Sequence, residues 1–178
     1  MKSMKTEPPT AVETIKAFES HSKVIGLPPL AIHLKNILVP LDFSEQSLKS
    51  LQYAIPFAKQ FGARLTLLHV VDLPVYTPEL PYPPPLGPEH HEAVKKHLDE
   101  IRATKIPAEV SVETAVRHNF VFEGILEVAR EIQADLIITT THGYTGLKHM
   151  LIGSTAENIV RKAPCPVLVV REVEHDFV

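Results

Sequence analysis

Several residue types and patterns are scarce in this chain, and each scarcity excludes a class of protein. Among 178 residues only Cys165 is a cysteine, so no disulfide can form within the chain. The longest apolar runs have about five to seven residues, whereas a membrane-spanning helix needs about 20. The first eight residues lack the apolar stretch of a signal peptide. Together these features predict a cytoplasmic protein.

Positive charge is neither abundant nor clustered. Lys and Arg number 18 against 21 Asp and Glu, which gives a formal net charge of -3. Nucleic-acid-binding domains usually carry a basic patch or stripe, so we expect no nucleic-acid partner, and the short apolar runs predict no membrane partner. The apolar content of 44% is ordinary for a soluble domain of this length with a real core.

Strand-like and helix-like patterns alternate from residue 35 onward. Short runs rich in Val, Ile and Leu predict five strands, and amphipathic spacing predicts a helix between each pair of them. Nearly continuous apolar strands separated by helices indicate a parallel sheet covered on both faces. We therefore predict a five-stranded, doubly wound α/β domain over residues 35–173. The predicted strands are 36–39, 64–71, 110–114, 135–139 and 166–170.

Three stretches fall outside this alternation. Residues 1–34 are rich in Pro and polar residues and are interpreted as a partly flexible N-terminal extension, and residues 174–178 as a C-terminal tail. In the segment 73–88, seven of sixteen residues are proline, which excludes a helix or a central strand there. We interpret this segment as a stiff connector, with a lid or a partner-docking segment as the alternative.

The clearest functional pattern follows the fourth predicted strand. Thr140-Thr141-His142-Gly143 leaves that strand, and Gly153-Ser154-Thr155 leads into a helix. The first N–H groups of a helix have no intrahelical partners and attract anions. Glycines let the backbone approach a ligand closely, and Ser154 and Thr155 add hydroxyl groups. The pattern therefore predicts a phosphate-binding loop.

With these segments in order, the chain resembles the universal stress proteins. The family signature, Gly-x2-Gly-x9-Gly followed by Ser or Thr, is matched by Gly143, Gly153 and Ser154, with Thr140 in place of the first glycine. Three further pieces match the family pattern, at 37–44 (ILVPLDFS), 67–70 (LLHV) and 163–170 (APCPVLVV). The resemblance covers residues 35–171.

The resemblance implies a Rossmann-like sheet of the adenine nucleotide alpha hydrolase-like type, with strand order 3-2-1-4-5. Ligands of open α/β sheets bind beyond the strand C-termini, at the point where the strand order reverses. The implied ligand is an adenine nucleotide, ATP or AMP, with or without Mg²⁺. Residues after the first two strands would face adenine and ribose, and those of the loop would hold phosphates. The implied binding residues are Pro40, Leu41, Asp42, Val70, Thr139, Thr140, His142, Gly143, Gly153, Ser154 and Thr155.

Three of these residues have competing interpretations. Ser154 followed by Glu157 fits a capping box, in which the serine satisfies amides of its own helix. Asp42 followed by Glu45 fits a helix N-cap in the same way. Thr140 replaces glycine poorly if the position requires a positive φ, but it is tolerable if it only lines the strand end.

The sequence favours nucleotide binding over turnover. It contains no G-x-x-x-x-G-K-[ST] loop to place a lysine on a γ-phosphate, and we assign no catalytic residue. We also assign no metal ligand, because His90, His91 and His97 have no matching set of carboxylates or cysteines. Two alternatives stay open: a slow ATPase or phosphotransferase using Asp42, and a nucleotide-free interaction module, which Thr140 favours.

Self-association is a separate expectation. The last predicted strand is apolar and belongs at the edge of the sheet, where unpaired backbone groups invite a further strand. The resemblance implies a symmetric homodimer through this strand. Its contact residues would be Val167, Leu168, Val169 and Val170.

Overall fold

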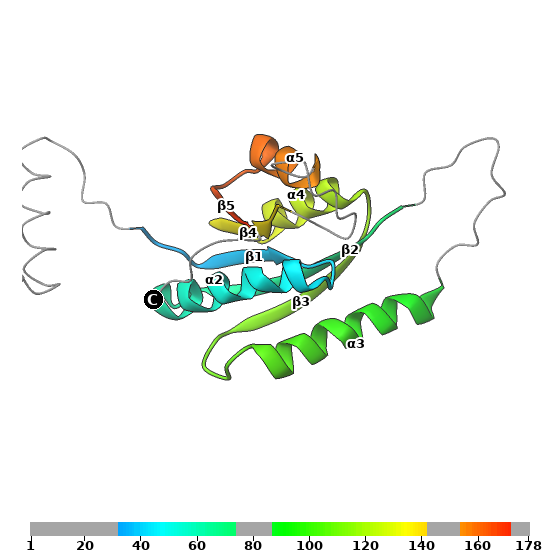
Figure 1. Cartoon of the computed structure of the whole chain (residues 1–178), viewed down its shortest axis with the longest axis horizontal. Helices are drawn as coiled ribbons and strands as arrows, with labels where there is room; N and C mark the ends of the chain where they lie inside the picture. The colour runs from blue at the N-terminus through cyan, green and yellow to red at the C-terminus, as the bar shows by residue number, and fades with distance from the viewer. Residues whose placement is uncertain (1–31, 74–86, 142–153, 172–178) are drawn as a thin grey trace, which may run out of the picture. The chain divides into compact units, whose positions relative to one another are not determined.

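The computed structural model describes residues 32–73, 87–141 and 154–171. The chain divides into one unit of residues 1–33 and a second of residues 34–178, and the second contains every strand and helix named below. In chain order they are β1 (Asn36–Pro40), α2 (Glu45–Phe61), β2 (Arg64–Val71), α3 (Pro88–Lys105), β3 (Val112–His118), α4 (Val121–Glu131), β4 (Leu136–Thr140), α5 (Ser154–Lys162) and β5 (Val167–Val170) (Figure 1).

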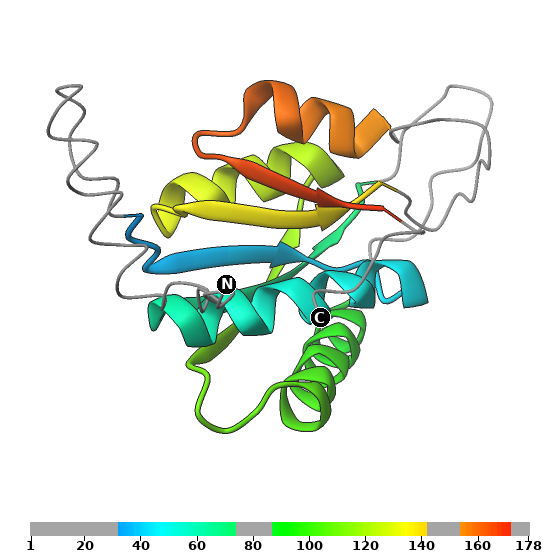
Figure 2. The same cartoon turned by 60° about the vertical axis from the view of Figure 1, so that its left-hand side comes forward.

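The five strands form one parallel sheet in the order β3-β2-β1-β4-β5. This arrangement confirms the predicted fold class and strand order. Helices α2 and α3 cover one face of the sheet, and α4 and α5 cover the other (Figures 1 and 2). In the described part of the chain, no helix is long and apolar enough to cross a membrane.

Alternating side chains of the strands build two cores, one on each face. Ile37 and Val39 pack with α2 and α3 residues such as Leu51 and Leu98. Leu38 and Ile137 pack on the opposite face, in a cluster that also contains residues of α4 and α5. Because successive side chains of a strand point to opposite faces, an apolar run without alternation is what a sheet covered on both sides requires.

Local signals explain where the elements begin and end. Ser44 caps α2 by accepting a hydrogen bond from the N–H of Ser47 at 3.0 Å. Gly62 ends this helix and adopts φ 65°, in the left-handed region that glycine enters without a Cβ penalty. The third strand begins at Val112 rather than at the predicted Val110, because the Val110 N–H is bonded to the carbonyl of Pro107 in a turn.

Candidate functional site

The central strands β1 and β4 are neighbours from which the chain departs in opposite directions. After β1 it enters α2 on one face, and α5, the helix that follows β4, lies on the other face (Figure 2). Strand C-termini and the start of α5 meet at one edge of the sheet, which is the switch point where open α/β sheets bind ligands. Of the eleven residues predicted for the site, His142, Gly143 and Gly153 lie outside the described residues.

Pro40 and Leu41 end the first strand, and both are held firmly in the sheet. The side chain of Leu41 is 3% exposed and belongs to the core beneath α2 and α3. Its N–H donates to the carbonyl of Leu68 at 2.8 Å, and its carbonyl lies 2.8 Å from Nδ1 of His69. Since its N–H and its carbonyl both have partners within the protein, Leu41 would contact a ligand by van der Waals packing rather than by hydrogen bonds.

Asp42 organises the turn into α2. Its Oδ1 accepts hydrogen bonds from the N–H of Ser44 at 3.0 Å and from Oγ of Ser44 at 2.6 Å. The N-cap of α2 is Ser44, so the N-cap interpretation of Asp42 with Glu45 was wrong. The carboxylate sits two residues earlier because Phe43 occupies the corner between strand and helix. Asp42 is therefore fixed at the strand end by the capping residue itself.

An aromatic stack stands beside this turn. The Phe43 ring lies parallel to the His69 ring, with centroids 4.2 Å apart and an interplanar angle of 13°. On its other side it stacks on His97 of α3 at 4.3 Å and 8°. Phe43 also has φ 67°, a conformation that is costly for a bulky residue. The stack thus fixes a strained backbone position immediately after Asp42.

His69 lies half-buried in this stack. Burial lowers the pKa of His69, and the charges of His90 and His97 act in the same direction, against the Leu41 hydrogen bond and the Asp42 charge, which raise it. An unfolded chain then takes up the proton more readily than the folded protein. The contribution of His69 to the free energy of unfolding is fully present above about pH 6.5, the ordinary pKa of histidine. It is lost as the pH falls from that value toward the lower pKa of the folded protein.

We expect the His69→Gln protein to lose this part of the pH dependence. Urea unfolding at pH 7.5, 6.5 and 5.5 should show a smaller loss of free energy of unfolding on acidification than in the wild type. The control is His33→Gln, which changes an exposed histidine ahead of the first strand. Equal pH dependence in the wild-type and His69→Gln proteins would contradict the proposed role of the half-buried imidazole.

The side chain of Val70 lies on the opposite face of the sheet, which α4 and α5 cover. Its side chain belongs to the α4 and α5 core and is 9% exposed. A Cβ added to Gly124 of α4 would lie 2.9 Å from Cγ1 of Val70, which explains a glycine inside a helix. The close approach of α4 fixes the position of Val70, so this residue contributes a rigid apolar surface near the switch point.

Thr139 and Thr140 end the fourth strand. Thr139 is 8% exposed, and both pair with the last strand, opposite Val169 and Val170. Thr140 has extended strand geometry and does not need the positive φ that would favour glycine. Threonine is therefore compatible with the backbone conformation at this position, which ends the strand.

Ser154 and Thr155 open α5. Ser154 is the first residue of this helix, and its carbonyl accepts a hydrogen bond from the side-chain Nδ2 of Asn158 at 2.9 Å. The carboxylate of Glu157 accepts a hydrogen bond from Arg161 at 2.7 Å. In a capping box that carboxylate would reach back to the helix start. Its pairing with Arg161 takes the place of that contact and partly neutralises the acidic charge in the first turn.

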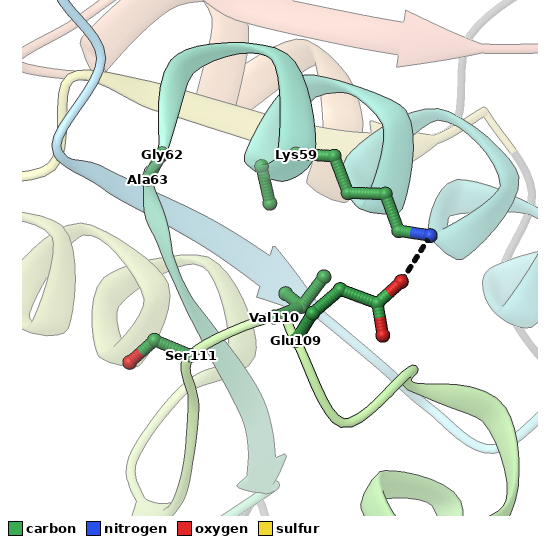
Figure 3. Close-up of a pocket in the computed structure, with 7 residues that line it drawn as sticks. Lys59, Gly62, Ala63, Glu109, Val110 and Ser111 are labelled. Carbon is green, nitrogen blue, oxygen red and sulfur yellow. Dashed lines mark ion pairs between the residues drawn. The ribbon is translucent and has the colours of Figure 1, made fainter.

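A pocket of about 300 Å³ lies at the opposite end of the strands, near the N-termini of β2 and β3 (Figure 3). It is built where α2 ends and where β2 and β3 begin, and Nζ of Lys59 meets Oε1 of Glu109 across it at 2.7 Å. The hydrogen bond from Lys59 lowers the pKa of Glu109. This pocket contains none of the predicted site residues. It is lined by Ala58, Lys59, Gly62, Ala63, Glu109, Val110 and Ser111.

Sequence reasoning missed the stacked rings of Phe43, His69 and His97. Two of them stood inside quoted motifs, Phe43 in ILVPLDFS and His69 in LLHV. The available signal was their position, because both motifs end parallel strands and must meet at one sheet edge. His97 comes from α3, and no local pattern connects it to the other two.

Comparisons with known proteins agree with this architecture. The model of the universal stress protein family matches residues 33–171. Universal stress protein MJ0531 of Methanocaldococcus jannaschii is 35% identical, with 78% of this chain and 82% of that protein covered. The structure of universal stress protein UspA from Lactobacillus plantarum superposes with a TM-score of 0.62 at 26% identity, covering 79% and 99% of the two chains.

The chain belongs to the universal stress protein family. A further solved structure has the same fold, that of the universal stress protein from Archaeoglobus fulgidus in complex with dAMP. Its TM-score is 0.54 at 19% identity, and the match covers 78% of this chain and 98% of that one.

Proposed function

We propose that this protein binds an adenine nucleotide, ATP or AMP, at the sheet edge where β1, β2 and β4 end and α5 begins. The observation that carries this proposal is the switch point itself, with Asp42 fixed on one side and the N-terminus of α5 on the other. The complex of a fold relative with dAMP supports the nucleotide class. Binding would let the protein sense or carry a nucleotide in a stress response.

The strength of such a site follows from its donors. Hydrogen bonds to a charged group contribute about 1.5–3 kcal/mol each, and a helix dipole about 0.3–1 kcal/mol. Three amides and one hydroxyl at the start of α5 would support a binding free energy of about 8 kcal/mol, which corresponds to a dissociation constant on the order of micromolar. The sequence has no lysine-bearing phosphate loop of the ATPase type, so we propose binding without efficient turnover.

Calorimetric titration of the full chain tests this proposal. We expect saturable heat with AMP and with ATP, measured with and without Mg²⁺, and a rise in melting temperature at saturating nucleotide. CTP is the matched control, because it offers the same triphosphate with a different base. The absence of both heat and thermal shift at millimolar AMP and ATP would overturn nucleotide binding.

We further propose a homodimer formed through β5. This strand ends the order of the sheet in the described residues, and Val167, Leu168 and Val169 are only half-buried. An apolar edge strand presents backbone groups to which a second copy can add its own strand. Sedimentation at micromolar concentration should give the mass of two chains, and the mass of one chain would contradict the proposal.

A further inference from the structure

Histidines gather on one face of the sheet near the strand C-termini. His69 of β2 and His118 of β3 project toward the face covered by α2 and α3, because the parallel register pairs His69 with Val116 and Val71 with His118. Helix α3 adds three more histidines, at positions 90, 91 and 97. The fold thus brings five of the six histidines in the described residues to one end of one layer.

Two of these histidines face each other across the helix–strand contact. Nδ1 of His91 lies 3.2 Å from Nε2 of His118, and the ring centroids are 5.5 Å apart with an interplanar angle of 18°. The residues are 27 positions apart in the chain. Only the docking of α3 on β3 brings them together, and the sequence pattern around His91 gave no sign of His118.

The docking that holds the pair is well anchored. Leu98 and Ile101 of α3 are buried in the core beneath the helix. Further along the same contact, Oγ1 of Thr114 donates to Oδ1 of Asp99 at 3.0 Å. Because the helix is fixed to the strand at these points, the two imidazoles are preorganised. His91 is half-buried and His118 exposed, so small ions have access to the pair.

The nitrogen–nitrogen distance of 3.2 Å is close to the spacing of two ligands on one metal ion. With Zn–N bonds of about 2.0–2.1 Å and tetrahedral angles, two ligand nitrogens lie about 3.3–3.4 Å apart. Without metal the two nitrogens share a hydrogen bond; to bind an ion both rings would have to turn their lone pairs toward it, with the shared proton moving to the far nitrogen of its ring. Imidazole suits Zn²⁺, Cu²⁺ and Ni²⁺ rather than Mg²⁺ or Ca²⁺, which prefer oxygen ligands.

We propose that His91 and His118 form a two-histidine site for a divalent transition-metal ion, with water completing the coordination. In the described residues no group of three or more His, Cys, Asp or Glu surrounds one point, so the site is open and exchanges its ion readily. A bound ion would fasten the start of α3 to the end of β3.

Titration of the full chain with Zn²⁺ alone, at pH 7.5, tests the proposal by calorimetry. His91→Gln and His118→Gln should each weaken the binding that involves these rings at least tenfold. The matched control is His90→Gln, which removes the neighbouring histidine of the same helix and should leave the affinity unchanged. Circular dichroism and melting temperatures without metal establish that the variants are folded.

A spectroscopic measurement separates this site from the remaining histidines. Electron paramagnetic resonance with one equivalent of Cu²⁺ should show coupling to two imidazole nitrogens in the wild type, and a changed spectrum in both pair variants. The proposal is overturned if Zn²⁺ produces neither heat nor thermal shift. It is equally overturned if Zn²⁺ affinity and the Cu²⁺ spectrum are the same in wild type, His91→Gln and His118→Gln.

Discussion

Replacing Phe43 by alanine should lower the free energy of unfolding by about 2–3 kcal/mol. The substitution removes a half-buried ring, and Phe→Ala changes in full cores cost about 3–5 kcal/mol. It also breaks two stacked contacts, with His69 and His97, of a kind that contributes about 0.5–1.5 kcal/mol each. Alanine would in addition still have to adopt φ 67°.

Phe43→Gly is the matched variant, because it removes the same ring but relaxes the backbone. A left-handed conformation costs a residue with a Cβ about 1–2 kcal/mol, which glycine avoids. We therefore expect the glycine protein to be more stable than the alanine protein by about 1 kcal/mol and less stable than the wild type. Urea unfolding of the three proteins measures this order. Equal stability of the two variants would show that the positive φ carries no strain.

Asp42→Ala should weaken adenine nucleotide binding at least about tenfold. A hydrogen bond to a charged group is worth about 1.5–3 kcal/mol, and 1.4 kcal/mol corresponds to a factor of ten. The same variant also loses the two hydrogen bonds that hold Ser44, the N-cap of α2. Calorimetric titration with AMP gives the change in affinity, and urea unfolding gives the change in stability.

Asp42→Asn separates these two effects. Its amide oxygen can still accept from the Ser44 N–H and hydroxyl, so the turn and the stability should be close to wild type. AMP affinity should lie between those of the wild-type and alanine proteins, because asparagine keeps an oxygen acceptor of the same shape but has lost the negative charge. Asp72→Ala, an exposed carboxylate after the neighbouring strand β2, is the control and should bind normally. Wild-type affinity in Asp42→Ala would remove Asp42 from the site.

The order of the elements, and with it the ends of the strands at which a site is expected, could be predicted because both depend on local patterns. Segments rich in apolar residues, such as 36–39 and 135–139, predict buried strands, and amphipathic spacing predicts the helices between them. The direction of parallel strands then places Asp42, Val70 and Thr140 at one edge. The fold class follows from the pattern of the residues, and the strand order from the resemblance carried by four motifs.

Details that depend on contacts between distant segments could not be predicted. The N-cap of α2 is Ser44 rather than Asp42 because Phe43 turns the backbone at a positive φ, which no propensity favours for phenylalanine. Two rings stack on Phe43 in this conformation, and one of them, His97, belongs to α3. The pairing of His91 with His118 depends in the same way on how α3 lies across β3. Such contacts follow from the fold and leave no periodic signal in the sequence.

The most direct test of nucleotide binding at the switch point is an NMR titration of ¹⁵N-labelled full-length protein with ATP. We predict that the largest amide shifts fall at the strand C-termini and the start of α5, at Asp42, Val70 and Thr155. The amides of the pocket at the opposite end of the strands, such as Lys59 and Glu109, should change little. Shifts concentrated at that pocket, or no shifts at millimolar ATP, would contradict the proposed site.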